Sequence, residues 1–430
     1  MKTLFEICSP SHDILKGDIR ESDLAADLAQ VINGTAPSEY AFPNKFFANT
    51  HPTQGLKALL KTVCQRLQGV GGSAVLRLDT QYGGGKIHSL IALTHAAQGM
   101  KGVNNISEFI DPELVPAIAV RLAAFDGENA DPVNGRPLGD GLRAYTPWGE
   151  LAYGLAGVAG YEKVHRSDIE RVAPGAATIQ ELFGNQPVLI LLDELSIYLR
   201  KIKGRKEQEQ LTPFLTALFK AVSSSERACV VFTLAVGKEG KATDAYSQEN
   251  EFIADKLDEA TKVAGRVATL LNPTTEQETV QVLRRRLFSY IDENAAQEVI
   301  CNYEQLWITD RSDLPTERVN ADRVADFRNG FPFHPALMDL LTDKLSTLST
   351  FQRVRGMLRL LTRTIAHLWQ ETPANTYAIH LHHVNPGYIP IRDEITTRLE
   401  LGRFVPVIEN DVAATDKETS LAQQLDAIPT

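Results

Sequence analysis

Asp79-Thr80-Gln81-Tyr82-Gly83-Gly84-Gly85-Lys86-Ile87-His88-Ser89 is the stretch from which the rest of the chain can be interpreted. The apolar run before it, residues 74–78, predicts a buried strand, and the pattern after it predicts a helix. Glycines let backbone N–H groups turn inward around an anion, and the N-terminus of the next helix adds a positive dipole end. A lysine at this place can reach the outer phosphates of a nucleotide. We therefore interpret the stretch as a phosphate-binding loop, whose candidate nucleotide-binding residues are Gly83, Gly84, Gly85, Lys86, Ile87 and His88.

The loop departs from the usual pattern at two positions. Thr80 stands where a glycine usually begins the loop, which suggests a different entry into it. Ile87 stands where the hydroxyl of Ser or Thr normally binds Mg²⁺, and isoleucine offers no ligand. Ser89 lies roughly 200° further around the helix, so we do not expect it to substitute. A glycine run before lysine can also be an ordinary flexible turn. The second half of the site distinguishes this possibility from a phosphate-binding loop.

That second half is an acidic pair after the most apolar run in the chain. Residues 187–192 predict a central parallel strand, and Asp193-Glu194 follow it. Asp193 would help to hold Mg²⁺, and Glu194 would polarise the water that attacks the terminal phosphate of ATP. An acidic pair also occurs by chance at the surface end of many strands. Together with Lys86 at another strand end, however, the pair predicts a site for ATP and Mg²⁺.

Four further residues are candidates on weaker grounds. Thr233 follows a third apolar strand and could place a hydroxyl near the attacking water, although threonine is also an ordinary strand former. Arg266 could reach the phosphate of a neighbouring subunit in a ring, or it could be a surface arginine. Arg355 and Arg359 lie four residues apart, hence on one helical face, which could close on the nucleotide from a lid or be a solvated basic face.

Strands that alternate with helices predict a parallel sheet with helices on both faces. From residue 273 to residue 372 only helices are expected, and the irregular segment from Pro373 onward has a possible strand at residues 377–381. We therefore predict an α/β fold: a P-loop NTPase parallel sheet flanked by helices, followed by an all-helical lid domain, as in AAA+-type proteins. The predicted domains are an N-terminal arm (1–54), the nucleotide-binding domain (55–272), the lid (273–372) and a C-terminal extension (373–430) whose open end suggests truncation. One helix is expected at residues 211–222, with Thr212 as its N-cap and Pro213 in the first turn.

Composition excludes several classes of protein. A net charge of −10 over 430 residues gives no global basic field, so binding of nucleic acid would need a local patch such as residues 201–206, which could equally be a solvated turn. The four cysteines form no CxxC pair, as in a reduced cytoplasmic protein. We expect no signal peptide, no membrane span and a cytoplasmic location. His380, His382 and His383 could supply imidazoles to a metal, but no carboxylate or cysteine has a compatible spacing nearby.

The chain resembles the nucleotide-binding portion of a family of large prokaryotic AAA+-type ATPases, a domain of unknown function often encoded with anti-phage modification and defence genes. The segments that carry the resemblance span most of the chain: residues 46–56, 82–90, 148–152, 192–195, 331–335 and 351–361. The resemblance implies that Lys86 binds phosphate, Asp193 the metal and Glu194 the water, with Arg359 as the lid sensor. Ile87 departs from the threonine of that family. Its members also continue further, which suggests a fragment here.

Three hypotheses follow. In the first, the chain is an AAA+-type module that hydrolyses ATP between subunits of a homo-oligomeric ring and moves a partner or DNA, with other defence-system proteins as candidate partners. In the second, it is a nucleotide-gated scaffold in which Ile87 makes turnover slow or absent. The third, a small-molecule kinase, is less favoured because Glu194 suits activation of water.

Overall fold

The computed structural model describes residues 1–15, 27–80, 85–235, 255, 269–271, 278–310, 321–345, 351, 354–414 and 419–425. The chain forms two compact units. We call the first, Ala26–Thr275, the sheet unit, and the second, Met1–Ala25 together with Glu276–Thr430, the helical unit. The predicted arm, residues 1–54, is therefore divided between the two units, and the predicted extension, residues 373–430, belongs to the helical unit.

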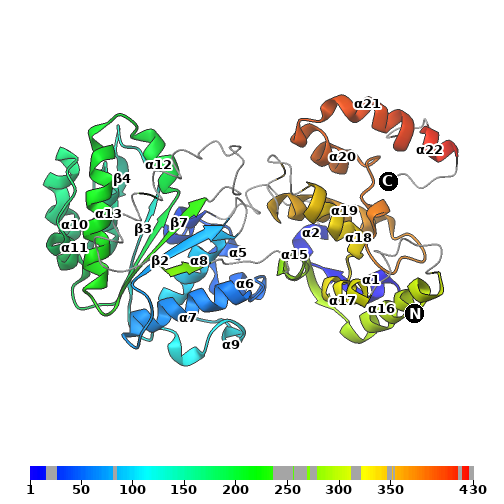
Figure 1. Cartoon of the computed structure of the whole chain (residues 1–430), viewed down its shortest axis with the longest axis horizontal. Helices are drawn as coiled ribbons and strands as arrows, with labels where there is room; N and C mark the ends of the chain where they lie inside the picture. Colours follow the sequence, from blue (N-terminus) through cyan, green and yellow to red (C-terminus); the bar gives the residue numbers. More distant parts are fainter. Residues whose placement is uncertain are drawn as a thin grey trace. The chain divides into compact units, whose positions relative to one another are not determined.

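The sheet unit is built on a five-stranded sheet of order β3-β6-β7-β2-β8 (Figure 1). Every neighbouring pair is parallel, which confirms the predicted parallel α/β class. Its strands are β2 (Val75–Thr80), β3 (Arg121–Asp126), β6 (Val188–Asp193), β7 (Ala228–Ala235) and β8 (Thr269–Leu271). All six residues of β6 are buried, as expected for a central strand that is covered on both faces. A separate hairpin, β4 (Arg136–Gly139) with β5 (Leu142–Ala144), lies between β3 and the next helix.

Helices cover both faces of this sheet (Figure 1). One face packs against α4 (Leu28–Ile32), α5 (Ser38–Ala41), α6 (Pro43–Ala48), α7 (Gln54–Gln68), α8 (Lys86–Ala97) and α9 (Ile106–Phe109). The other packs against α10 (Pro147–Glu170), α11 (Ala176–Phe183), α12 (Leu195–Lys201) and α13 (Lys206–Ser223). The predicted helix at 211–222 thus begins earlier, with Pro213 inside it.

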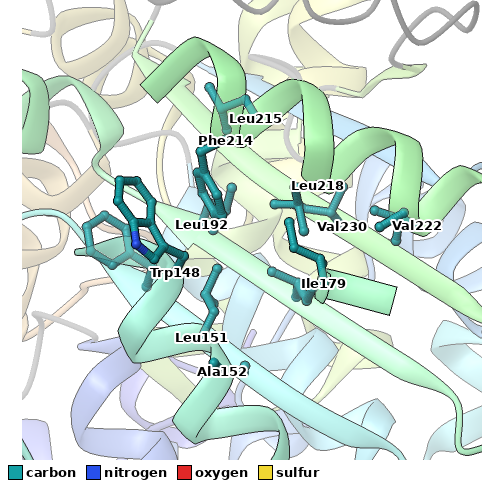
Figure 2. Close-up of a cluster of buried hydrophobic side chains, with 14 of the residues drawn as sticks. Trp148, Leu151, Ala152, Ile179, Leu192, Phe214, Leu215, Leu218, Val222 and Val230 are labelled. Atoms are coloured by element: carbon teal, nitrogen blue, oxygen red, sulfur yellow. The ribbon is translucent and has the colours of Figure 1, made fainter. Parts of the chain in front are cut away.

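The side chains of β6 alternate between two separate cores, as the period of a strand requires. Leu189 and Leu191 pack under α7 and α8, whereas Ile190 and Leu192 pack under α10 to α13. Figure 2 shows Leu192 in this second core, which Trp148 of α10 shares with residues of α11 and α13. Burial therefore determines which face of the sheet each side chain of β6 occupies.

The helical unit contains ten α-helices among the residues that the structure describes. They are α1 (Leu4–Ile7), α2 (His12–Leu15), α15 (Thr279–Leu287), α16 (Glu293–Thr309), α17 (Ala321–Gly330), α18 (Pro335–Asp339), α19 (Val354–Glu371), α20 (Ile389–Ile395), α21 (Val405–Val407) and α22 (Leu421–Gln424). The expectation of an all-helical domain is wrong in one respect. Strand β1 (Cys8–Pro10) pairs antiparallel with β9 (Phe288–Ile291). The pairing occurs because residues 1–15 pack into this unit, where Leu4, Ile7 and Cys8 are buried.

The segment after residue 373 also packs into the helical unit. Ala378, Ile379 and Ile391 are fully buried in its core, beside residues of α19. The described residues of this segment are therefore part of the folded helical unit. In the described part of the chain, no helix combines the length and apolar character that crossing a membrane requires.

Candidate functional site

Polar side chains gather where three adjacent strands of the sheet end. Strand β3 ends at Asp126 and β6 at Asp193, and these two residues are register partners, while Thr233 lies near the end of β7. The residues two positions earlier, Ala124, Leu191 and Val231, all pack in the core beneath α7 and α8. Because side chains alternate along a strand, Asp126, Asp193 and Thr233 project from that same face. The three form a row at the carboxyl edge of the sheet.

Helix α8 begins on this face of the sheet. Gly85 precedes it with φ 79°, a left-handed conformation that suits glycine, and Lys86 is its first residue. The helix that follows β2 and the helix that follows β6 lie on opposite faces. In open α/β sheets, ligands bind outside the carboxyl ends of the strands where the connections change face in this way. The row of polar residues therefore lies where such folds place their ligands.

Lys86 is held among the carboxyl groups of this site. Its side chain is only 7% exposed. Its positive charge lowers the pKa of both Asp193 and Glu194, in opposition to the larger effect of burial. Within the described residues, no hydrogen bond or ion pair occupies the Lys86 ammonium. A lysine side chain that is mostly buried and has no partner among the described residues is suited to an anionic ligand.

Asp193 is fixed through one of its two carboxylate oxygens. Oδ1 accepts a hydrogen bond from the Thr233 hydroxyl and another, 3.1 Å long, from the backbone N–H of Glu194. Oδ2 has no hydrogen-bond partner in the part of the chain that the structure describes. The side chain is 3% exposed, and burial raises its pKa, which the Thr233 hydrogen bond and the Lys86 charge partly oppose. Thr233, predicted to lie near the attacking water, therefore orients Asp193.

Glu194 sits at the start of α12 with a left-handed backbone, φ 50°. The pKa of its carboxyl group is raised to about 7, chiefly by burial and also by the charges of Asp193, Glu128 and Asp126, while the charge of Lys86 opposes the rise. Among described residues its carboxyl group has no hydrogen-bond partner. An uncommitted carboxyl group that changes protonation near neutral pH is suited to general acid or base chemistry.

The loop after β3 packs closely against the backbone of Asp193 and Glu194. The Gly127 N–H donates a 3.0 Å hydrogen bond to the Asp193 carbonyl oxygen. A Cβ added at Gly127 would lie 2.1 Å from the Glu194 carbonyl oxygen, so no larger residue fits without movement of the backbone. The close approach fixes Asp126 beside both acids.

Asp126 was missed as a site residue by sequence reasoning. Its Oδ1 accepts a 2.9 Å hydrogen bond from the Glu128 N–H, and its Oδ2 accepts one from the Asn129 amide. Its charge acts on Asp193 and on Glu194. A signal was present, because Asp126 follows an apolar strand just as Asp193 does. The signal was not recognised, because Asp126 also begins a loop that is rich in Gly, Pro and Asp.

The residues after Lys86 do not provide a metal ligand. Ile87 packs against the core beneath α7 and α8. The Ser89 hydroxyl donates a 2.9 Å hydrogen bond to the Gly85 carbonyl oxygen and is not placed to replace the missing hydroxyl. Gly83, Gly84 and Arg266 lie outside the described residues.

A family model described as the DUF499 N-terminal domain matches residues 11–267 of this chain, and another, described as the DUF499 second domain, matches residues 274–426. The chain belongs to the DUF499 family. The break between the two matches falls just before the boundary of the two units at Thr275. A comparison with curated proteins gave no match.

In this DUF499 chain His88 links α8 to the preceding segment. The Thr50 hydroxyl donates to the Phe46 carbonyl oxygen at 2.7 Å, so it must accept the 2.8 Å hydrogen bond from His88 Nε2, which therefore carries a proton. The His88 ring also packs 4.4 Å from the Phe46 ring. His88, predicted to contact the nucleotide, thus ties the start of α8 to residues 46–50.

The DUF499 chain uses the segment 148–152 for packing and for one buried ion pair. Trp148 packs against Phe214 in the core, and Glu150 pairs with Arg136 of the hairpin at 2.8 Å. Burial raises the pKa of Glu150 to about 7, and Arg136 partly opposes it. The pair holds the hairpin against α10.

Arg355 and Arg359, the predicted lid arginines, lie on α19 of the helical unit. Arg359 donates from Nε to Glu394 Oε1 at 2.6 Å, and Arg363 and Arg398 also pair with Glu394, whose side chain is 0% exposed. Arg359 therefore has a structural partner within its own unit. Arg355, one turn earlier, is half-buried.

The remaining candidate sites of this DUF499 chain have structural partners. His380 Nε2 and the Tyr303 hydroxyl are 2.7 Å apart. The backbone N–H of His380 donates a 2.9 Å hydrogen bond to His383 Nδ1. No group of three His, Cys, Asp or Glu side chains in the described ranges is arranged to hold a metal ion. In the basic run 201–206, the Lys201 ammonium donates to the carbonyl oxygens of Glu128 and Ala130, which stabilises the β3 loop.

Proposed function

We propose that the sheet unit is an AAA+-type, P-loop ATP-binding module that hydrolyses ATP. The observation that carries the proposal is the buried Lys86 side chain. Its charge acts on Asp193 and Glu194 at the carboxyl edge of a parallel sheet, and it has no partner in the described structure. A triphosphate would supply the anion that Lys86 needs, at the N-terminus of the twelve-residue helix α8.

The residues present fit a nucleotide together with Mg²⁺. Asp193 Oδ2, which has no partner among the described residues, would hold the ion, while Thr233 keeps the other oxygen in place. Mg²⁺, when bound, neutralises the phosphate oxygens and helps to orient them. Such ions are commonly held by one or two carboxylates plus phosphates, so the lack of a larger ligand cluster is no obstacle.

Glu194 would accept a proton from the attacking water through its carboxylate. This role requires the charged form of Glu194. The positive charge of Lys86 favours that form by lowering the pKa of Glu194, whereas burial disfavours it. Lys86 would therefore serve both the phosphates and the base.

The alternative function is a nucleotide-gated scaffold with little or no hydrolysis. It is favoured by Ile87, which packs into the core, and by the engaged hydroxyl of Ser89. Under this alternative ATP binding would order an assembly. A small-molecule kinase remains less favoured, because a glutamate such as Glu194 suits the activation of water.

Assembly and biological role follow from the resemblance alone. We propose a homo-oligomeric ring in which Arg266 acts on the phosphate of a neighbouring subunit and Arg355 of α19 acts in the lid, within a defence-related or DNA-processing assembly. The mass of the chain in solution, with and without ATP, tests the ring directly.

Binding of a fluorescent ATP analogue to the full chain and to Lys86→Ala tests the site. We expect binding to be lost in Lys86→Ala and kept in Lys61→Ala, a matched change at an exposed lysine of α7. Equal binding to all three proteins would refute the proposal.

Steady-state ATP hydrolysis by the wild type and by Ile87→Thr separates the two functions. Turnover that appears only in Ile87→Thr favours the scaffold. Wild-type turnover that threonine does not improve would show that Ile87 is no obstacle, and Glu194→Gln should then abolish it.

A further inference from the structure

The site carries more negative charge than its lysine can balance. Asp126 and Asp193 end adjacent strands at this edge, Glu194 follows Asp193, and Glu128 lies two residues after Asp126. Lys86, the first residue of α8, is a cation whose charge acts on Asp193 and Glu194. A triphosphate alone would add further negative charge to this site. A cation must therefore enter with it, and the question is which side chains hold that cation when residue 87 has no hydroxyl.

Two carboxylates are placed to share one cation. Asp126 and Asp193 are register partners on adjacent parallel strands, and both project from the face on which α8 lies. Neighbouring strands are about 4.8 Å apart, so two carboxylates in such a pair can both reach an ion that prefers oxygen ligands at about 2.1 Å. Asp193 Oδ2 has no hydrogen-bond partner in the described structure. Each Asp126 oxygen accepts one hydrogen bond and keeps a second lone pair.

An independent observation, the environment of Lys86, also points to a ligand at this site. Lys86 is more than nine-tenths buried, its charge acts on Asp193 and Glu194, and no described residue pairs with it. Lys86 requires an anion, whereas the carboxylates require a cation. A divalent cation bound to a triphosphate satisfies both requirements at once.

We propose that Asp126, together with Asp193, binds the divalent cation of the nucleotide complex and supplies the ligand that Ile87 cannot. This inference rests on the proposed function, because the phosphates complete the coordination of the ion. It makes Asp126 a metal ligand of the site, and it explains how a loop without the usual hydroxyl could still bind a metal–nucleotide complex.

The test measures two affinities in Asp126→Asn: that for Mn²⁺ in the presence of ATP, by electron paramagnetic resonance, and that for a fluorescent ATP analogue without metal. We expect the Mn²⁺ affinity to fall at least about tenfold. Metal-free binding of the analogue should stay the same or become tighter, because one negative charge is removed. A merely structural role of Asp126 would weaken both affinities. A lower Mn²⁺ affinity together with an unchanged or higher affinity for the metal-free analogue therefore identifies Asp126 as a metal ligand.

Asp131→Asn is the matched control, because Asp131 makes the same kind of loop contacts, to the N–H groups of Val133 and Asn134, in the same connection. It should change neither affinity. Ile87→Thr combined with Asp126→Asn should recover part of the Mn²⁺ affinity.

Three outcomes would overturn the inference. Mn²⁺ affinity within twofold of the wild type in Asp126→Asn, with ATP binding intact, refutes Asp126 as a ligand and leaves the proposed function standing. A parallel loss of both affinities assigns Asp126 a structural role. Failure of the wild-type chain to bind the ATP analogue removes the proposed function and this inference with it.

Discussion

Acidification to pH 5 is expected to destabilise the helical unit through its buried histidines. His380 and His383 pack with His334 and His382, and burial lowers the pKa of His380 to about 3 and that of His383 to about 4. In the unfolded chain a histidine has a pKa of about 6.5. The unfolded state therefore binds more protons below that value, and stability falls as the pH decreases from 6.5 toward the folded pKa values.

The magnitude follows from the difference in proton binding. At pH 5 an unfolded histidine is protonated and each of these folded ones is largely neutral, which costs about 2 kcal/mol per residue and about 4 kcal/mol for the pair. Because a domain is typically stable by about 5–15 kcal/mol, the change should be large.

Urea unfolding of the full chain measures this change. Trp307 and Trp369 lie in the helical unit and Trp148 in the sheet unit, and they are the three tryptophans of the chain. In a Trp148→Phe background, tryptophan fluorescence therefore reports the helical unit alone. His380→Gln should remove about half of the pH dependence.

His12→Gln, at an exposed histidine of the same unit, should leave the pH dependence unchanged. A helical unit equally stable at pH 7.5 and pH 5, within about 1 kcal/mol, would contradict the reasoning, because it would mean that these histidines gain protons without loss of structure.

Two further predictions concern single positions. Gly127→Ala should lower the stability of the chain in thermal unfolding by about 2 kcal/mol, because the added Cβ would lie 2.1 Å from the Glu194 carbonyl oxygen. The control is Gly402→Ala, because nothing lies within 4 Å of a Cβ at that position. Equal melting temperatures of the two variants would argue against the close approach at Gly127. Arg359→Ala should destabilise the helical unit by about 3 kcal/mol in urea unfolding, because the fully buried Glu394 loses one of its partners; a loss below about 0.5 kcal/mol would place Arg359 outside the structural core.

The parts of the fold that could be predicted are those with a local signal. A buried parallel strand is a continuous apolar run, so β6 and its terminal Asp193 stand out in the sequence. Glycines before Lys86 likewise indicate where a helix must start. These signals gave the sheet and the two ends of the candidate site.

The other features depend on contacts that no local pattern encodes. The spacing of Arg355 and Arg359 predicts that they share one helical face. It does not predict that Arg359 forms an ion pair with the buried Glu394. Pro213 suggests the first turn of a helix, yet α13 begins seven residues earlier, at Lys206, because its buried face extends further and tertiary packing outweighs the local signal. Asp126 becomes a site residue only through its register with Asp193.

The pairing of β1 with β9 makes the sheet unit an insertion within the helical unit. During synthesis the first strand must wait for a partner that emerges about 280 residues later, whereas the sheet unit can close as soon as its own strands are complete. The chain also crosses between the units twice, after Ala25 and after Thr275. A shortened protein intended to carry the sheet unit alone should therefore begin near residue 26, since the residues before it would lack their strand partner.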